Sequence, residues 1–121
     1  MNVARTVLIV DDEFGLADIA ADLLRDVGYD VVVAINGKAG LASLMARPTE
    51  LVIVDWMMPV MDGPEMIRRM KAEPALAKIP VILMTALPEA SRTQTLADAT
   101  LLKPFGLADL LRTMERLLQR A

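Results

Sequence analysis

The stretch Val7-Leu8-Ile9-Val10-Asp11-Asp12 decides the fold, because four consecutive apolar residues lead directly into two carboxylates. A continuous apolar run without polar alternation is typical of a strand buried on both faces of a parallel sheet. Similar runs return at residues 31–34, 51–54 and 81–84, and a weaker one lies at 99–102. Five such runs in one chain predict a five-stranded parallel sheet.

Helical patterns separate these strands. The clearest has apolar residues spaced i, i+3, i+4, i+7, i+8 and i+11, at Leu16, Ile19, Ala20, Leu23, Leu24 and Val27. This stripe predicts the core-facing side of the first helix, and Gly28 is placed to end that helix. A second stripe predicts the last helix, at Leu107, Leu110, Leu111, Met114, Leu117 and Leu118.

Alternation of strands and helices predicts a doubly wound α/β fold, with right-handed crossovers and helices on both faces of the sheet. The chain has 121 residues, 55% of them hydrophobic, which suits one buried core. The sequence contains no internal repeat and no low-complexity tract. We therefore expect residues 1–121 to form a single domain.

The composition excludes several classes of function. The chain has neither cysteine nor histidine, so disulfides, thiolate or imidazole catalysis and the usual zinc sites are excluded. A net charge of -3 without a basic stripe argues against direct nucleic-acid binding. The N-terminal residues have no secretory pattern, and every apolar run is too short to span a membrane. We expect a cytoplasmic protein whose chemistry rests on carboxylates, hydroxyls and lysine.

Polar residues follow four of the predicted strands. Asp11, Asp12 and Glu13 follow the first, Asp55 the third, Thr85 and Ala86 the fourth, and Lys103 and Pro104 the fifth. Ligands of parallel sheets bind at the carboxyl ends of the strands, so these side chains are expected on one edge. A single aspartate at a strand end is more often a helix cap than a functional group.

Three carboxylates on one edge indicate a cation site more strongly than a single aspartate does, because like charges at close range repel unless a cation neutralises them. Oxygen ligands alone favour Mg²⁺, which the sequence predicts between Asp12, Asp55 and an incoming phosphoryl group. Asp55 is placed to act as a nucleophile that forms an aspartyl phosphate. The Thr85 hydroxyl and the Lys103 ammonium suit the phosphoryl oxygens.

The chain resembles the receiver domain of two-component response regulators, a flavodoxin-like family. The resemblance rests on four motifs in the family's order: Val10-Asp11-Asp12-Glu13, Asp55-Trp56-Met57-Met58-Pro59-Val60-Met61-Asp62-Gly63, Met84-Thr85-Ala86 and Leu102-Lys103-Pro104-Phe105. It implies the strand order 2-1-3-4-5.

The resemblance also implies the role of each site residue. Asp11 and Asp12 would hold Mg²⁺, together with Asp55 and the backbone carbonyl of Met57. Asp55 would accept a phosphoryl group from a histidine kinase or a histidine phosphotransfer protein, while Thr85 and Lys103 contact it. Apart from the resemblance, the position of Trp56 and Met57 next to Asp55 on a loop predicts that they control access to it.

Two departures from the family pattern concern the output side. Thr100 stands where the family usually has an aromatic residue, so the switch that would include Thr100 and Phe105 is expected to be altered. Thr85 and Lys103 are 18 positions apart, about four fewer than usual, which predicts a short or irregular fourth helix at residues 88–97. We expect this segment to be mobile.

Several functions remain open at this stage. The leading one is a phosphorylation-switched module that signals to a downstream protein target, as a monomer or weak homodimer. The chain is then not an enzyme, beyond assisting its own Mg²⁺-dependent phosphorylation and dephosphorylation. Alternatives are a receiver from a larger regulator with a DNA-binding or enzymatic output domain, and a non-phosphorylated docking or dimerisation receiver. A phosphatase with an aspartate nucleophile would need an Asp-x-Asp run after the first strand, which is absent.

Overall fold

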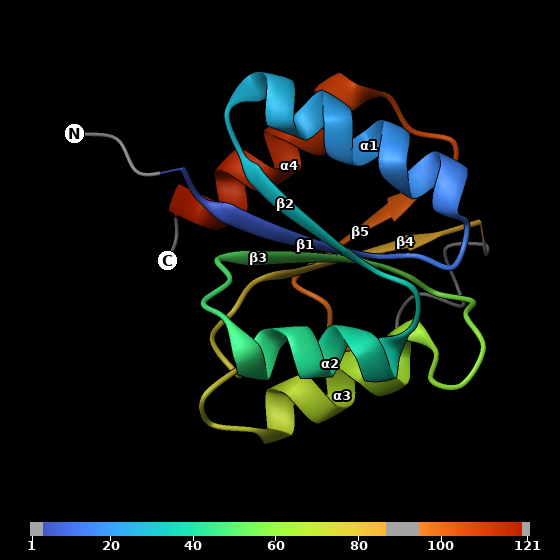
Figure 1. Ribbon diagram of the computed structural model, residues 1–121, viewed down its shortest axis with the longest axis vertical. Coiled ribbons are helices and arrows are strands. Elements are labelled where there is room, and N and C mark those ends of the chain that lie inside the picture. Colours follow the sequence, from blue (N-terminus) through green and yellow to red (C-terminus); the bar gives the residue numbers. More distant parts are fainter. Residues whose placement is uncertain (1–3, 87–94, 120–121) are drawn as a thin grey trace.

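A computed structural model describes residues 4–86 and 95–119, in which five strands form one sheet. The strands are β1 (Thr6–Val10), β2 (Asp30–Ala34), β3 (Leu51–Asp55), β4 (Val81–Thr85) and β5 (Ala99–Leu102). All pairs are parallel, and the order is β2-β1-β3-β4-β5 (Figure 1). The five predicted strands and their predicted order are confirmed.

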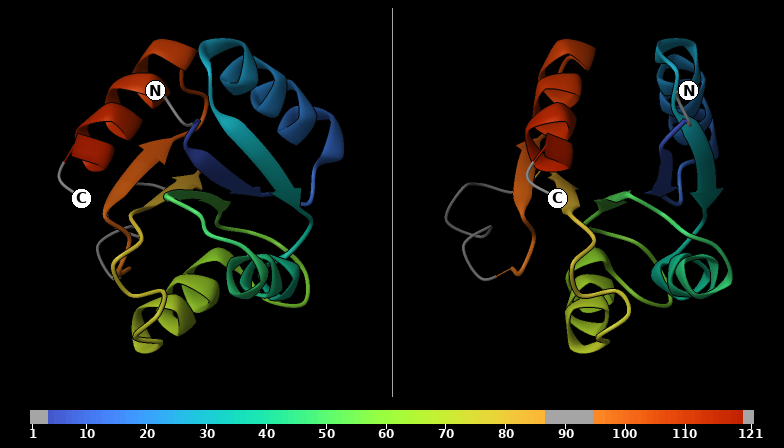
Figure 2. Two further views of the ribbon diagram at one scale, coloured as in Figure 1. Left: turned by 60° about the vertical axis from the view of Figure 1, so that its left-hand side comes forward. Right: turned by 90° about the vertical axis from the view of Figure 1, so that its left-hand side faces the viewer.

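The helices of the described residues cover both faces of the sheet. They are α1 (Phe14–Val27), α2 (Gly37–Ala46), α3 (Gly63–Ala72) and α4 (Leu107–Gln119). Figures 1 and 2 show α1 and α4 on one face, with α2 and α3 on the other. Each face has its own cluster of buried side chains, and the strands contribute to both clusters. The predicted doubly wound fold is therefore confirmed.

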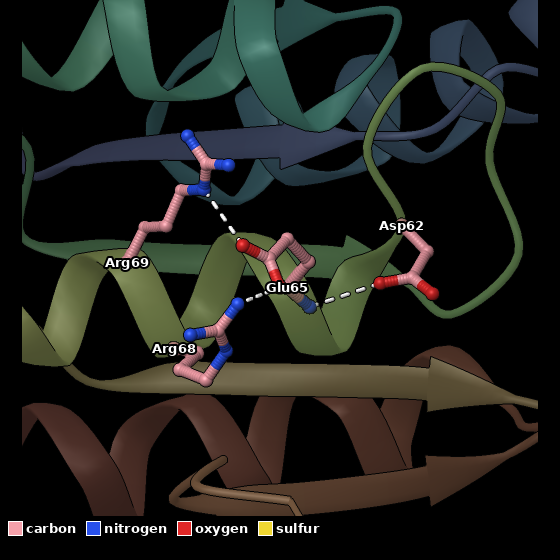
Figure 3. Close-up of polar contacts among 4 residues, drawn as sticks. All are labelled: Asp62, Glu65, Arg68 and Arg69. Carbon is pink, nitrogen blue, oxygen red and sulfur yellow. Dashed lines mark hydrogen bonds and ion pairs between the residues drawn. The ribbon is translucent and has the colours of Figure 1, made fainter.

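Local signals fix the ends of the helices. Gly28 ends α1 in the left-handed region, at φ 113°, as its place in the sequence predicts. Asp62 begins α3, because its Oδ1 accepts a hydrogen bond from the Glu65 N–H at 2.9 Å (Figure 3). The Glu65 side chain forms ion pairs with Arg68 and Arg69 within the first two turns of α3. The hydrogen bond from Arg68 is the main cause of the lowered pKa of Glu65.

The predicted core face of α1 is partly wrong. Its four largest outer side chains are 41% to 59% exposed, namely Leu16, Ile19, Leu23 and Val27. The buried face consists of Ala17, Ala21 and Leu24, with Ala20 half-buried. The alanines let the helix axis approach the sheet closely, so the stripe of larger residues one step around the helix is left in solvent.

The predicted short fourth helix falls mostly outside the described residues, since 87–94 are not described. Residues 95–97 are described and contain neither helix nor strand. The expectations of a short helix and of mobility there stay predictions. Within residues 4–86 and 95–119, no helix has both the length and the apolar character that crossing a membrane requires.

Candidate functional site

The parallel sheet brings the predicted site residues to one edge. Asp11 comes directly after β1, Asp55 and Thr85 are the last residues of β3 and β4, and Lys103 follows β5. The arrowheads of the strands in Figure 1 point to this edge. Because neighbouring strands run in the same direction and in register, residues that are far apart in sequence meet there.

Three carboxylates form the centre of the site. One carboxylate oxygen from each of Asp11, Asp12 and Asp55 lies within 4.8 Å of the others. Asp11 and Asp55 are buried, whereas Asp12 is exposed. Burial is the main cause that raises the pKa of Asp11, and the negative charge of Asp55 raises it further. A hydrogen bond from the Glu13 N–H to Asp11 Oδ1, at 3.0 Å, acts in the opposite direction.

Lys103 supplies a positive charge to this cluster. Its Nζ lies 2.8 Å from Asp55 Oδ1, so the two side chains form a largely buried ion pair. Burial opposes the charge of Lys103, but the hydrogen bond to Asp55 and the charges of Asp55 and Asp11 outweigh it, and the pKa of Lys103 is raised. The Lys103–Pro104 peptide bond is cis.

The remaining predicted residues lie around this cluster. Thr85 is buried beside Asp55 on the next strand, and its carbonyl oxygen accepts a hydrogen bond from the Lys103 N–H at 2.7 Å. Trp56 is half-buried and Met57 is 71% exposed. Both line an open hollow of about 500 Å³ whose other walls are Asp12, Met58, Pro59 and Asp62. The two residues predicted to control access therefore share a hollow with Asp12 of the acidic cluster.

The two predicted output residues lie within β5 and in the segment that follows it. Thr100 is half-buried within β5, where it is paired with Leu83 of β4. Phe105 is half-buried and packs against the core cluster between the sheet, α1 and α4. Together with Lys103 and Asp11 it lines an apolar groove of about 340 Å³ between these two helices.

The donor set of the acidic cluster fits Mg²⁺. Every candidate ligand is an oxygen, and Mg²⁺ takes oxygen ligands at about 2.0–2.1 Å while keeping several waters. Opposite ligands of one such ion are about 4.2 Å apart by the same geometry, so oxygens within 4.8 Å can share it directly or through one water. Two ionised carboxylates this close repel each other, and the single ammonium of Lys103 can neutralise only one of them, so a bound cation would relieve the remaining repulsion.

One feature near the site was not predicted from the sequence. Val60, in the loop between β3 and α3, has φ 71°, which is unusual for a β-branched residue. Nothing in its sequence neighbourhood signals this conformation, except that Pro59 and Asp62-Gly63 indicate a turn.

Comparison with known proteins assigns the chain to a family. The model of the response regulator receiver domain family matches residues 7–115. The chain belongs to the response regulator receiver domain family. Receiver domains are the phosphorylation-switched signalling modules of two-component systems rather than enzymes in the usual sense, and they interact with histidine kinases or phosphotransfer proteins.

Two relatives show how far the similarity extends. The phosphate regulon transcriptional regulatory protein PhoB of Pseudomonas aeruginosa is 34% identical over 98% of this receiver chain, which covers 53% of PhoB. The chemotaxis protein CheY-3 of Vibrio cholerae is 32% identical, and the match covers 99% of this chain and 96% of CheY-3. The receiver thus spans about half the length of the first transcriptional regulators that it matches and almost the whole of a chemotaxis regulator.

Solved structures agree with the fold. The receiver domain of a signal transduction histidine kinase from Syntrophus aciditrophicus has a TM-score of 0.92 and 32% identity, over 98% of this chain and 92% of that one. The receiver domain of the sensor histidine kinase PA1611 from Pseudomonas aeruginosa has a TM-score of 0.89 and 26% identity, over 97% and 99%. That structure has a magnesium ion coordinated in its active-site cleft.

Proposed function

We propose that Asp55 is the residue that accepts the phosphoryl group in this receiver. The observation that carries the proposal is the cluster of three carboxylates within 4.8 Å, with the ammonium of Lys103 2.8 Å from Asp55 Oδ1. Asp55 combines a carboxylate nucleophile with a neighbouring cation site and a neighbouring ammonium. An aspartyl phosphate needs this combination, because its formation brings more negative charge into the pocket.

Asp11, Asp12, Asp55 and the backbone carbonyl of Met57 would hold Mg²⁺. The fit of the oxygen set and the Mg²⁺ in the PA1611 receiver support this assignment. When bound, Mg²⁺ would neutralise the carboxylates and the charge that develops on the transferring phosphoryl group. Because Asp11 is buried and already hydrogen-bonded to the Glu13 N–H, we expect it to act mainly through a water molecule.

In the proposed reaction, an Asp55 oxygen attacks the phosphorus of a phosphohistidine. The O–P bond forms as the N–P bond breaks, and the imidazole leaves with the electron pair of that bond. Lys103 exchanges part of its contact with Asp55 for the phosphoryl oxygens, which its ammonium stabilises as a point charge. The hydroxyl of Thr85, on the neighbouring strand, donates a hydrogen bond to another of these oxygens.

The partners follow from the same chemistry. The donor is a histidine kinase or a histidine phosphotransfer protein, and the phosphorylated receiver signals through contacts with a downstream protein. The acidic composition, with sixteen acidic and thirteen basic residues, supports protein contact rather than nucleic-acid binding by this chain. The half-length match to PhoB also supports a second proposal, in which this receiver controls an output domain of a larger regulator.

Phosphorylation by a small donor tests the central proposal. The chain is incubated with acetyl phosphate and Mg²⁺, and the intact mass is measured. We expect one added phosphoryl group on the wild type, none on Asp55→Asn, and none when EDTA removes the metal. The proposal is wrong if the wild type gains no phosphoryl group, or if Asp55→Asn gains one at the wild-type rate.

A further inference from the structure

Met57 is one of two methionines among the described residues whose side chain is exposed. Its side chain is 71% exposed, and that of Met45 is 65% exposed. The other described methionines are buried, except Met58 and Met61, which are half-buried against the core cluster of the α2 and α3 face. Met57 belongs to neither core cluster. Its thioether sulfur is therefore open to solutes, and a polar change at this side chain leaves the core intact.

An exposed thioether is the group of this chain that a hydroperoxide oxidises most readily. The chain has no cysteine, so no thiol competes for the oxidant. A lone pair of the sulfur attacks one oxygen of hydrogen peroxide, and the S–O bond forms as the O–O bond breaks. The departing hydroxide takes the proton of the transferred oxygen and leaves as water. The sulfur is oxidised to a sulfoxide, and sulfoxide reductases reverse the change.

The Met57 side chain lies beside the cluster of three carboxylates. Met57 and Asp12 line the same open hollow of about 500 Å³. Asp12 is also the exposed member of the cluster that it forms with Asp11 and Asp55. The hollow has room for several water molecules. A cation held by the cluster would therefore have its waters on the side where Met57 stands.

Oxidation changes the Met57 side chain from a soft donor into a hard one. Thioether sulfur suits soft metal ions, whereas Mg²⁺ takes oxygen ligands and keeps several waters. A sulfoxide oxygen carries a partial negative charge and accepts hydrogen bonds. It can bind the ion directly or accept a hydrogen bond from one of the waters on the ion. Without oxidation, Met57 offers the ion only its backbone carbonyl oxygen.

We propose that Met57 is a redox modification site, at which oxidation by a hydroperoxide tightens the binding of Mg²⁺ to the neighbouring carboxylates. This inference rests on the proposed function, because it requires Mg²⁺ to bind at Asp11, Asp12 and Asp55. The modification adds an oxygen donor to the hollow without adding a net charge to a cluster that is already negative. An oxidised receiver then becomes competent for phosphorylation at a lower Mg²⁺ concentration.

The test uses Met57 and Met45 as a matched pair. Met45 is similarly exposed but lies in the last turn of α2, which begins after β2 at the edge of the site and ends at the opposite edge. Met57→Leu and Met45→Leu each remove one exposed sulfur. Met57→Gln and Met45→Gln each place an amide oxygen on a side chain of similar length, which imitates the sulfoxide without an oxidant.

Each protein is measured before and after limited treatment with hydrogen peroxide. Peptide masses give the oxidation of each methionine and verify that Trp56 is unchanged. The fluorescence of Trp56, the single tryptophan, gives the dissociation constant of Mg²⁺ because Trp56 lines the same hollow. Urea unfolding in EDTA gives the stability.

We expect peroxide to oxidise Met57 and Met45 before the other described methionines. The dissociation constant of Mg²⁺ for the wild type should then fall about three- to tenfold, as for one added hydrogen bond. The urea midpoint in EDTA should stay the same, because neither exposed side chain belongs to a core cluster. Sulfoxide reductases with a dithiol should restore the original dissociation constant.

The variants separate the possible causes of a change in affinity. Met57→Leu should lose the response to peroxide, and Met45→Leu should keep it. Met57→Gln should bind Mg²⁺ more tightly than the wild type without an oxidant, whereas Met45→Gln should bind it like the wild type. An unchanged or weaker affinity after oxidation of Met57 would overturn the inference, as would a response that persists in Met57→Leu. An unoxidised wild type that does not bind Mg²⁺ would overturn the proposed function, and the inference with it.

Discussion

Asp11→Asn should stabilise the metal-free domain at neutral pH. The carboxylate oxygens of Asp11 and Asp55 are no more than 4.8 Å apart, and two unit charges at that distance repel by about 3.5 kcal/mol at an effective dielectric constant of about 20. The substitution also forfeits the attraction between Asp11 and Lys103, which offsets roughly half of this gain. The Asn Oδ1 can still accept the hydrogen bond from the Glu13 N–H. The expected net gain is about 1–2 kcal/mol in the free energy of unfolding.

The stability difference between Asp11→Asn and the wild type should also depend on pH. The pKa of Asp11 is raised above its ordinary value of 3.8, mainly by burial, so the folded state holds this proton more tightly than the unfolded state. The corresponding stability is fully present below the unfolded pKa and is lost as pH rises through the folded pKa. The variant has no such group, and its advantage should therefore grow from about pH 4 towards neutral pH.

Urea unfolding in EDTA and in Mg²⁺ measures both effects. Mg²⁺ should stabilise the wild type by binding the folded state, and it should stabilise Asp11→Asn much less. Asp12→Asn is the matched control, because Asp12 is exposed and water screens its charge, so its removal should weaken Mg²⁺ binding while stabilising the metal-free domain much less than Asp11→Asn does. A variant that is no more stable than the wild type in EDTA at pH 7, or an advantage that does not shrink at pH 4, would refute the reasoning.

Three further predictions test the fold around the site by urea unfolding. Leu24→Ala should cost about 2–5 kcal/mol because Leu24 is buried, whereas Leu23→Ala, one position away and 41% exposed, should cost less than about 1 kcal/mol; equal losses would contradict the corrected core face of α1. Gly63→Ala should destabilise the domain by more than about 2 kcal/mol, because its Cβ would lie 2.4 Å from a backbone oxygen. Gly15→Ala should stabilise the domain by about 0.5–1 kcal/mol, because Gly15 lies in α1 with open space around it. If Gly15→Ala were less stable than Gly63→Ala, backbone crowding would not be the cause of the loss at Gly63. Lys71→Met should cost about 1–3 kcal/mol, since this side chain donates to two backbone carbonyl oxygens and one carboxylate, and an unchanged midpoint would show that water replaces those bonds.

The strands and the position of the site could be predicted because both follow from local chemistry. Runs such as 7–10 and 51–54 are apolar at every position, which a strand buried on both faces requires. Parallel pairing then places the residue after each strand on one edge, without any knowledge of distances. The cluster of Asp11, Asp12 and Asp55 is a consequence of that topology alone.

The core face of α1 could not be predicted from periodicity, because two adjacent stripes of the helix are apolar. The pattern gave more weight to the larger residues, Leu16 and Ile19, than to Ala17 and Ala21. In the structure, how closely the helix can approach the sheet determines which stripe is buried, and the stripe of small residues permits the closer approach. The more apolar of two adjacent stripes is therefore not always the buried one.

The charge balance of the pocket depends on the distance between Lys103 and Asp55, which could not be derived from the sequence pattern. Lys103 is 48 positions from Asp55, and only the pairing of β3 with β4 and of β4 with β5 brings its Nζ to 2.8 Å from the carboxylate. One ammonium then faces three carboxylates, so the metal-free cluster keeps a net negative charge when all are ionised. That imbalance links stability, metal binding and pH, because each added cation or proton relieves the same repulsion. A receiver whose pocket were neutral without metal would show no such linkage, and Asp11→Asn distinguishes the two cases.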